Sequence, residues 1–343
     1  MICAWTHRLI GGNMLANVFL FLLGLVLLIK GGDWFVDGAT GLARRFKIPE
    51  LLIGATVVSI GTTLPEVMVS ATSAAQGIGG IAYGNAIGSI ICNTSLIAAV
   101  TIAVRPSKIN KKALRLPVIF FFAAAAFYCT MAYAFGNFSR VSGIILLLLF
   151  VAYMTLTVLQ MRKAPEEPKL AEANDEPIDK SADKKLLIKE IAFLVIGAAL
   201  IAFGADLLVD NGTAIAEELG VPSAVIGLTF VALGTSLPEL VTAITSLVKG
   251  HGALSLGNII GANLFNLVFV SGISTVIRPF DVPAETLVFG NIPLSFVLDI
   301  PVMLGVMLLL TLPAFIRGKL SRVQGIGLLA IYAAFTVLQF VLA

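Results

Sequence analysis

Charged residues are scarce in this chain: Asp, Glu, Lys and Arg together make up 13% of its 343 residues, whereas hydrophobic residues make up 58%. The mean hydropathy of +0.99 is far above what a soluble domain of this length needs in order to build a core. The scarcity of charge therefore excludes a soluble protein. It indicates a protein that crosses a lipid bilayer several times.

Histidine and cysteine are also rare. The two histidines, His7 and His251, and the three cysteines show none of the spacings of a zinc site, a redox pair or a metalloprotease. This argues against an intramembrane metal-dependent enzyme, and no cofactor is implied. We expect Cys92 to be a small, packed apolar residue.

Long apolar runs dominate the sequence. A membrane-spanning helix needs about 20 mostly apolar residues to cross a hydrocarbon core of roughly 30 Å. The sequence thus predicts an all-α polytopic membrane protein, and residues 1–13, which carry Arg8 and no long apolar core, are expected to be an N-terminal extension and not a cleaved signal peptide. Ten spans can be placed, at 15–38, 50–76, 80–104, 116–135, 140–161, 188–210, 222–248, 253–277, 299–316 and 322–342.

The positive charges are distributed unevenly between the loops. If the N-terminus lies outside, the segments on the inner side hold 19 of the 23 Lys and Arg residues. The positive-inside rule then predicts that both termini face outward, and this topological role accounts for the net charge without any nucleic acid. Residues 161–188 are expected to form a flexible cytoplasmic linker, because 164–185 contain three prolines, seven acids and four lysines and little that could be buried.

An internal repeat relates the two halves. Residues 51–106 match residues 224–279 at a constant offset of 173, with 20 of 56 positions identical. The linker separates five spans from five, which predicts a first repeat over 14–160 and a second over 189–343. Because each half crosses the membrane an odd number of times, the repeats should be inverted. Inverted repeats with a site on broken helices at the bilayer midplane are a common plan of secondary transporters.

Each copy contains a Gly-Thr-x-Leu-Pro-Glu hexapeptide, beginning at Gly61 and at Gly234. A helical proline lacks an N–H and clashes with the carbonyl four residues earlier, so both helices should open beside these glycines. An acid near the bilayer centre costs about 2.5 to 3.5 kcal/mol on insertion scales, so Glu66 and Glu239 indicate a functional site. Carboxylates beside freed carbonyls suit a hard cation such as Na⁺ or Ca²⁺.

Neighbouring hydroxyl and amide groups offer further oxygen ligands. Thr62 and Thr235 precede the two glutamates by four residues, so each pair can share a helix face. In the next span of each repeat, Ser89 ends the motif GNAIGS and Asn93 follows it, and Asn266 follows GNIIGA. The glycines of these motifs allow close helix packing. A lone threonine in a membrane helix usually bonds to its own backbone. The duplicated Pro-Glu beside these residues favours a ligand role instead.

The two hexapeptides, with GNAIGSIICN at 84–93 and GNIIGANLFN at 257–266, resemble the two alpha-repeats of the sodium/calcium exchanger branch of the cation/calcium antiporter superfamily, in its short prokaryotic form. The likeness covers nearly the whole chain. It implies a ten-helix antiporter of the cell membrane that exchanges Na⁺ for Ca²⁺ by alternating access, with Glu66 and Glu239 as the shared carboxylates. The resemblance also assigns ion ligands to the side chains of Thr62, Thr235, Thr63 and Ser236 and to the carbonyls of Ser59 and Ala232.

Two positions depart from the family pattern. Asn266 stands where many members have Asp, and Ala262 stands where a serine hydroxyl often contributes to an outer Na⁺ site. Two acids neutralise one Ca²⁺ or two Na⁺, so the sequence does not secure a three-to-one exchange. A proton-coupled or other-cation-coupled Ca²⁺ antiporter is the alternative, although Gly88 and Gly261 stand where the proton-coupled branch usually carries its acid.

An ion channel is a further alternative, since rings of acids line cation channels. A pair of acids at broken helices in a monomer-sized unit fits a carrier better. No obligate protein partner is evident in the sequence. The implied partners are Ca²⁺, Na⁺ or H⁺ and the lipid bilayer.

Overall fold

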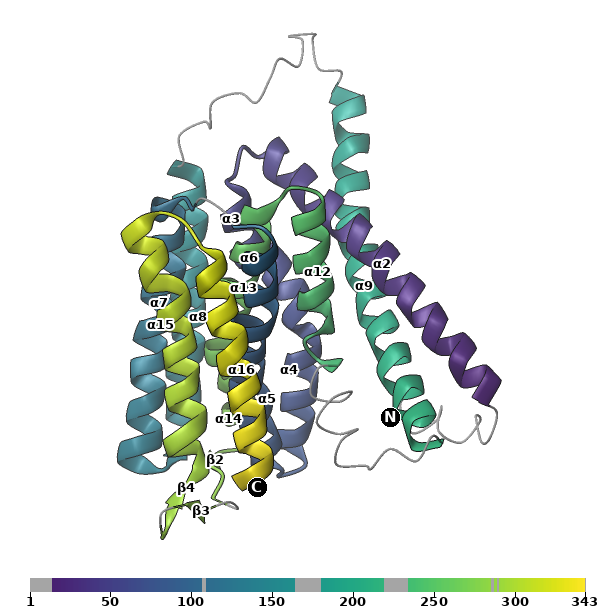
Figure 1. The fold of residues 1–343 in the computed structure, drawn as a ribbon. Helices are drawn as coiled ribbons and strands as arrows, with labels where there is room; N and C mark the ends of the chain where they lie inside the picture. Colours follow the sequence, from purple (N-terminus) through teal and green to yellow (C-terminus); the bar gives the residue numbers. More distant parts are fainter. Residues whose placement is uncertain are drawn as a thin grey trace.

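The computed structural model describes residues 14–106, 109–163, 180–218, 234–284, 287–288 and 290–342, and these form an almost entirely helical protein (Figure 1). Nine of the described helices are long and apolar enough to cross a membrane. In chain order, with η marking π-helical segments, they are α2 (Met14–Arg45), α3, η1 and α4 (Glu50–Ile53, Gly54–Val58, Ser59–Ala75), α5, η2 and α6 (Gly79–Cys92, Asn93–Ala98, Ala99–Val104), α7 and η3 (Lys111–Thr130, Met131–Phe135), α8 (Arg140–Lys163), α9 (Lys180–Glu218), α13, η5 and α14 (Gly252–Phe265, Asn266–Val270, Ser271–Ile277), η6 and α15 (Ser295–Asp299, Ile300–Arg317) and α16 (Arg322–Leu342).

The span predicted over 222–248 is seen in part. Its described portion is the apolar helix α12 (Leu237–Val248), and residues 219–233 lie outside the described residues, as do 1–13 and 164–179. Helix α9 begins at Lys180, inside the stretch expected to be a flexible linker, because Lys180 to Lys185 contains mostly good helix formers. The membrane class and the other nine predicted spans are confirmed.

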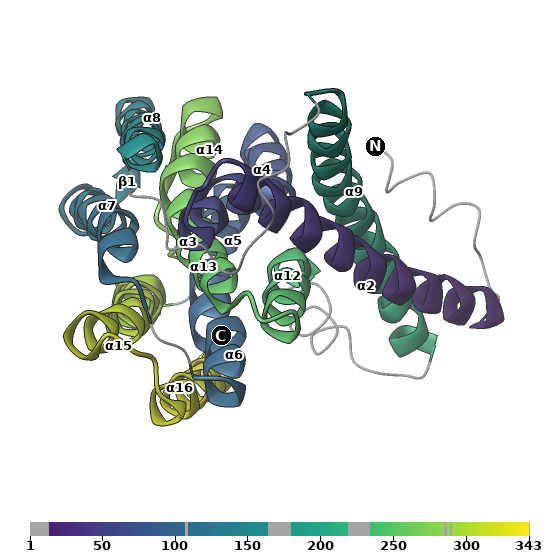
Figure 2. The same cartoon turned by 90° about the horizontal axis from the view of Figure 1, so that it is seen from above.

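Helices α2 and α9 cross each other beside the remaining bundle (Figures 1 and 2). Gly24 faces Gly204, and Gly31 faces Gly197; a Cβ built on Gly31 would lie only 2.9 Å from the Gly197 carbonyl oxygen. Residue numbers rise along one helix as they fall along the other, so the two helices are antiparallel. At the offset of 173, Gly24 corresponds to Gly197 and Gly31 to Gly204, so equivalent glycines of the two repeats form this contact.

The helices that carry the repeated motifs occupy the centre of the bundle, and α7, α8, α15 and α16 flank them (Figure 2). The span over Gly252–Ile277 is the most buried of the described spans, followed by Gly79–Val104. A Cβ at Gly257 would collide with the Leu51 carbonyl, and one at Gly261 would collide with the Ser59 hydroxyl. Close packing at these two glycines is therefore confirmed. A Cβ at Gly84 or Gly88 would meet no described atom within 4 Å, so the same expectation was wrong for the first repeat.

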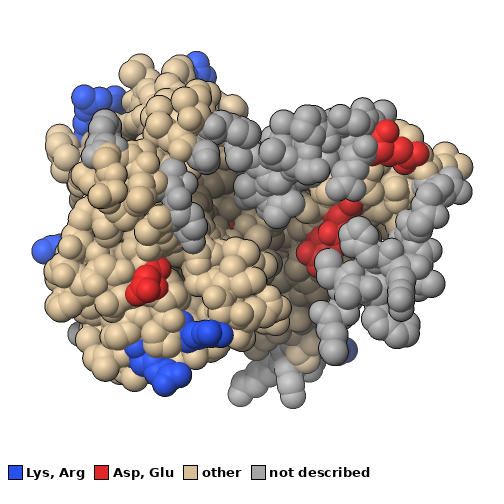
Figure 3. Space-filling model, turned by 90° about the horizontal axis from the view of Figure 1, so that it is seen from below, with Lys and Arg blue, Asp and Glu red and all other residues tan. Residues whose placement is uncertain are grey.

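Short strands join the loops at one end of the bundle. Strand β1 (Asn137–Phe138) pairs antiparallel with β2 (Phe280–Asp281), and β3 (Leu287–Val288) pairs with β4 (Ile292–Pro293). Seen from this lower end, acidic and basic side chains interrupt the described surface in only a few places (Figure 3).

Only one of the two predicted helix breaks is formed. Helix α4 runs through Pro65 without interruption, and the irregular backbone of that span is the π-helical segment η1, which precedes α4. The prediction at Gly61 was wrong, because one lost hydrogen bond is tolerated where neighbouring helices surround the backbone. After Gly234 the backbone does turn, and α12 begins at Leu237 with Pro238 in its first turn, where the missing N–H costs no hydrogen bond.

Candidate cation site

Glu66 of α4 and Glu239 of α12 are both completely buried, with relative exposures of 0%. None of their four carboxylate oxygens has a hydrogen-bond partner among the described residues, although the two side chains are close enough to repel each other electrostatically. Asp299, by contrast, accepts a hydrogen bond from Gln339. Buried carboxylates without partners are strongly unfavourable, and a cation between them would balance their charge.

Hydroxyl groups surround the two carboxylates. Thr62, Thr63 and Ser236 are at most 2% exposed, and the first two lie beside the Glu239 carboxylate. The hydroxyls of Thr63 and Ser236 have no hydrogen-bond partner among the described residues. They are thus available as neutral oxygen ligands. Thr235 is half-buried at the turn before α12.

Two asparagines begin π-helical segments at equivalent positions of the repeats. Asn93 is the first residue of η2, and Asn266 is the first residue of η5; both are 0% exposed. Neither the oxygen nor the nitrogen of either amide has a hydrogen-bond partner in the described part of the chain. Segments of this rare kind are frequent at functional sites. Ser89, one turn before Asn93, is also buried.

The two repeats contribute to the site crosswise. Helix α4, which carries Glu66, packs against η5, and α12, which carries Glu239, packs against η2. Each glutamate-bearing helix therefore contacts the asparagine-bearing segment of the other repeat. Cys92 lies beside Ser236 in the same region and belongs to an apolar cluster, as expected of a packed residue.

Asn258 is a further residue of this region, and the sequence analysis did not assign it a role. Its side-chain oxygen accepts a hydrogen bond from the Thr62 hydroxyl at 3.2 Å, and its backbone carbonyl accepts one from the Ser59 hydroxyl at 3.0 Å. Asn258 thereby ties the start of α4 to α13. The Ser59 side chain is engaged in this contact, and the repeat-equivalent Ala232 lies outside the described residues.

Asn85 supports the first glutamate from α5. Its amide nitrogen donates to the backbone carbonyl of Glu66 at 3.2 Å and to the Ser70 hydroxyl at 2.8 Å. Asn85 and Asn258 are identical residues at equivalent positions of the two GN motifs. That identity was the sequence signal by which both could have been found.

The donor set consists of two acids and neutral oxygens. No group of three or more His, Cys, Asp or Glu side chains gathers anywhere in the described ranges. Carboxylate, hydroxyl and amide oxygens are the ligands that hard cations prefer, whereas transition metals favour imidazole or thiolate. The donor set is therefore of the kind that suits Na⁺ or Ca²⁺.

A family model described as sodium/calcium exchanger protein matches residues 16–159 and again 189–341. This chain belongs to the sodium/calcium exchanger family. The family model thus matches the chain once in each half, on either side of the central linker.

Several family members are similar along nearly their full length. The chain is 34% identical to the putative antiporter CaxA of Alkalimonas amylolytica, over 96% of this chain and 99% of CaxA. It is 31% identical to the sodium/calcium exchanger MaX1 of Methanosarcina acetivorans, over 94% and 98% of the two chains. It is 36% identical to the inner membrane protein YrbG of Escherichia coli, over 92% and 94%.

Solved structures of the sodium-calcium exchanger NCX_Mj match this fold. Crystals soaked with Na⁺ without Ca²⁺, and with Na⁺ and Sr²⁺, give TM-scores of 0.77 and 0.76. In both comparisons the sequence identity is 32%, and the match covers 94% of this chain and 98% of NCX_Mj. The exchanger fold is therefore shared along the whole described bundle.

Proposed function

We propose that this chain is a secondary antiporter that exchanges Na⁺ for Ca²⁺ across a cell membrane. One observation carries the proposal: Glu66 and Glu239, at equivalent positions of the two repeats, are fully buried and have no hydrogen-bond partner in the described ranges. Ca²⁺ takes six to eight oxygen ligands in flexible geometry. The unpartnered hydroxyls and amides around the pair supply the neutral share of those ligands.

Exchange follows from competition for the same charge. Two carboxylates balance one Ca²⁺ or two Na⁺, so binding of one kind of ion removes the charge that the other needs. Thr62, Thr63, Ser236, Asn93 and Asn266 would complete the ion shell, with Thr235 and Ser89 at its edge. A site with two buried carboxylates is unfavourable without cations. The transporter should therefore change the side to which the site opens only with ions bound, which couples the two fluxes.

The two repeats, 14–160 and 189–343, would lie in opposite orientations, with both termini outside and the central linker in the cytoplasm. Antiparallel packing of α2 against α9 at equivalent glycines supports the inversion. The uneven distribution of Lys and Arg between the loops supports this orientation of the termini and the linker in the membrane. Inversion allows the site to face either side by alternate packing of the same sequence elements.

The relatives give independent support. MaX1 is named a sodium/calcium exchanger, CaxA a putative antiporter, and the NCX_Mj crystals were soaked with Na⁺, Ca²⁺ or Sr²⁺. Coupling to protons is the second candidate, because with an amide at Asn266 the site holds two acids, which leave a third Na⁺ without a balancing charge. The proposal includes neither a cofactor nor an obligate protein partner.

Transport measurements in proteoliposomes separate these candidates. A Na⁺ gradient and, separately, a pH gradient should be imposed on liposomes containing the purified protein, and ⁴⁵Ca²⁺ uptake measured. We expect uptake with the Na⁺ gradient, saturation with external Ca²⁺, and counterflow. Uptake driven only by the pH gradient would establish the proton-coupled alternative, and non-saturating flux without counterflow would indicate a channel.

A further inference from the structure

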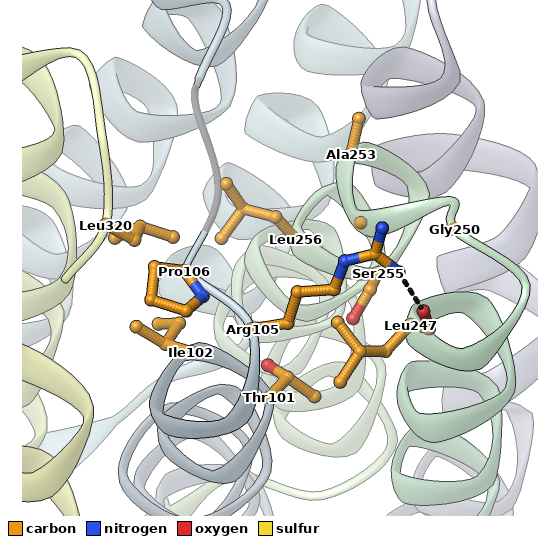
Figure 4. Close-up of a pocket in the computed structure, with 11 residues that line it drawn as sticks. Thr101, Ile102, Arg105, Pro106, Leu247, Gly250, Ala253, Ser255, Leu256 and Leu320 are labelled. Carbon is orange, nitrogen blue, oxygen red and sulfur yellow. Dashed lines mark hydrogen bonds between the residues drawn. The ribbon is translucent and has the colours of Figure 1, made fainter. Parts of the chain in front are cut away.

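A pocket lies at the opposite end of α12 from Glu239. It has a volume of about 270 Å³ and lies where α6 ends and α13 begins, with Arg105, Leu247, Gly252 and Ser255 among its lining residues (Figure 4). Leu247 and Glu239 are separated by roughly 12 Å along the helix axis. The pocket is therefore separate from the candidate cation site, and none of the described residues that line it is acidic.

Arg105 extends across this pocket. Its Nη1 donates to the Leu247 carbonyl at 3.2 Å, which holds the guanidinium near Ser255 between α6 and the α12–α13 turn (Figure 4). A guanidinium has five N–H donors in a planar fork. The bond to Leu247 uses one of them, so the group can still present a pair of donors to a ligand.

The start of α13 adds backbone donors at the same place. Helix α13 has 14 residues, and its N-cap residue, His251, makes no side-chain hydrogen bond to the first turn. The first N–H groups of a helix have no acceptor within the helix, and its dipole favours negative charge there. Gly252, the first residue of the helix, lines the pocket.

Ser255 provides the independent observation that this pocket is built for a ligand. Its side chain is only 3% exposed, its hydroxyl has no hydrogen-bond partner among the described residues, and it lines the pocket. A buried hydroxyl without a partner is unfavourable. An oxyanion in the pocket would accept its hydrogen bond.

The repeat-equivalent residues pack against one another at the corresponding place in the fold. Arg278, equivalent to Arg105, packs its guanidinium against Gly77, and Phe280 covers Gly79. Ala82 stands in the place of Ser255. This equivalent contact is filled and has no hydroxyl at the position of Ser255. Among the described residues of these two places, the pocket and the serine occur together at the start of α13.

We propose that this pocket binds a phosphate group, supplied either by the head group of an anionic phospholipid or by free phosphate. The arginine guanidinium can donate two parallel hydrogen bonds to two phosphate oxygens. The Ser255 hydroxyl can donate to a third phosphate oxygen, and the first N–H groups of α13 favour the negative charge. The ligand joins α6 of the first repeat to α12 and α13 of the second. It therefore stabilises the folded transporter when it binds.

The test uses the full-length protein purified in a non-ionic detergent. The thermal unfolding midpoint is measured against inorganic phosphate, with chloride holding the ionic strength constant, for the wild type and for Arg105→Gln, Ser255→Ala and Arg115→Gln. Arg115 is an exposed arginine of α7 that does not line the pocket, so its replacement controls for the loss of one positive charge. In parallel, native mass spectrometry compares retention of phosphatidylglycerol and phosphatidylcholine.

We expect the wild type and Arg115→Gln to respond alike. Arg105→Gln should weaken phosphate binding at least about tenfold, because a charge-assisted hydrogen bond is lost, and Ser255→Ala should weaken it roughly three- to tenfold. Arg105→Lys, which keeps the charge but loses the planar fork, should be intermediate, and it tests the proposal if Arg105→Gln does not fold.

The two measurements distinguish the sources of the phosphate. Stabilisation by inorganic phosphate without preferential retention of phosphatidylglycerol identifies the free anion, and selective lipid retention that depends on Arg105 identifies a head group. The proposal is overturned if the wild type shows neither response, or if Arg105→Gln and Arg115→Gln lose the response equally. Neither outcome depends on ion exchange, because Glu66 and Glu239 take no part.

Discussion

At the scale of single residues, the decisive property of the candidate site is the combination of burial with missing partners. Glu66, Glu239, Asn93 and Asn266 are all 0% exposed, and no described residue satisfies their side-chain polar atoms. Buried polar groups in folded proteins are nearly always hydrogen-bonded. A cluster of exceptions at equivalent positions of two repeats therefore supports the proposal that a ligand completes the set.

Glu66→Gln and Glu239→Gln should each abolish Ca²⁺ exchange in proteoliposomes. Removing one partner from a buried charged set costs about 3 to 5 kcal/mol, which corresponds to a loss of more than about 100-fold in Ca²⁺ affinity. Glu50→Gln is the matched control, because Glu50 lies outside the site and contacts His251; it should retain exchange.

The two glutamine variants should lose exchange but gain thermal stability when no ion is bound. In chelator without Na⁺ or Ca²⁺, an amide in place of an unpartnered buried carboxylate removes repulsion, so both variants should unfold at higher temperature than the wild type. Added Ca²⁺ should then raise the unfolding temperature of the wild type much more than that of the variants. An equal Ca²⁺ response in all three proteins would remove these glutamates from the site.

Asn266→Asp tests the departure from the family pattern. A third carboxylate adds negative charge that a further monovalent ion can balance, so the variant should need less Na⁺ for half-maximal Ca²⁺ flux or show a higher Hill coefficient for Na⁺. The flux should be measured with the membrane potential clamped. Asn93→Asp, the equivalent change in the first repeat, is the comparison: an unchanged Na⁺ response in a folded, active Asn266→Asp protein would show that this position does not tune the ion site.

At the scale of helices, the irregular backbone differs between the two repeats. In the first repeat, Pro65 lies within a continuous α4, and η1 precedes it. In the second, the chain turns at Thr235 and Ser236 and a new helix begins. The asparagine-bearing spans agree better, since both widen into π-helical segments at equivalent residues. Equivalent sequences therefore adopt unequal backbones around the glutamates.

The close contact of α2 with α9 predicts an unusual sensitivity to alanine. A Cβ at Gly31 would lie 2.9 Å from backbone atoms of α9, whereas one at Gly305 in α15 would meet no described atom within 4 Å. Gly31→Ala should destabilise the protein by about 1 to 3 kcal/mol through overpacking. Gly305→Ala should be neutral or stabilising, because alanine is the better helix former.

Thermal unfolding in detergent and transport by the same samples check this contrast. A Gly31→Ala protein as stable as Gly305→Ala would mean that the two helices do not approach closely. If Gly31→Ala lowers the unfolding temperature while the protein still transports the same ions, the contact supports the fold without taking part in ion selection.

At the scale of the whole molecule, the sequence was sufficient for the membrane class, the span positions and the family. Apolar runs fix the spans because a bilayer permits few backbone solutions, and the repeat identifies the paired motifs. Local rules were insufficient at Pro65, because neighbouring helices decide whether a proline breaks a helix. They also did not reveal the contacts of Asn85 and Asn258 or the pocket at Arg105, since these depend on which helices meet. The ion ligands and the inversion remain predictions.

Inversion can be tested by labelling the ends of α2 and α9. Arg44 and Glu218 are exposed residues at the C-terminal ends of these antiparallel helices; Arg45 is avoided because it pairs with Glu190 at 2.7 Å. Cysteines should be placed singly at 44 and 218 after Cys3, Cys92 and Cys129 are replaced by alanine.

A membrane-impermeant maleimide should label position 218 in intact spheroplasts and position 44 only after permeabilisation. The positive-inside rule sets that order, because Arg44 belongs to a basic segment. Labelling of both from one side would contradict the inverted arrangement, whereas the reverse order would keep the inversion and reverse the orientation of the whole molecule in the membrane.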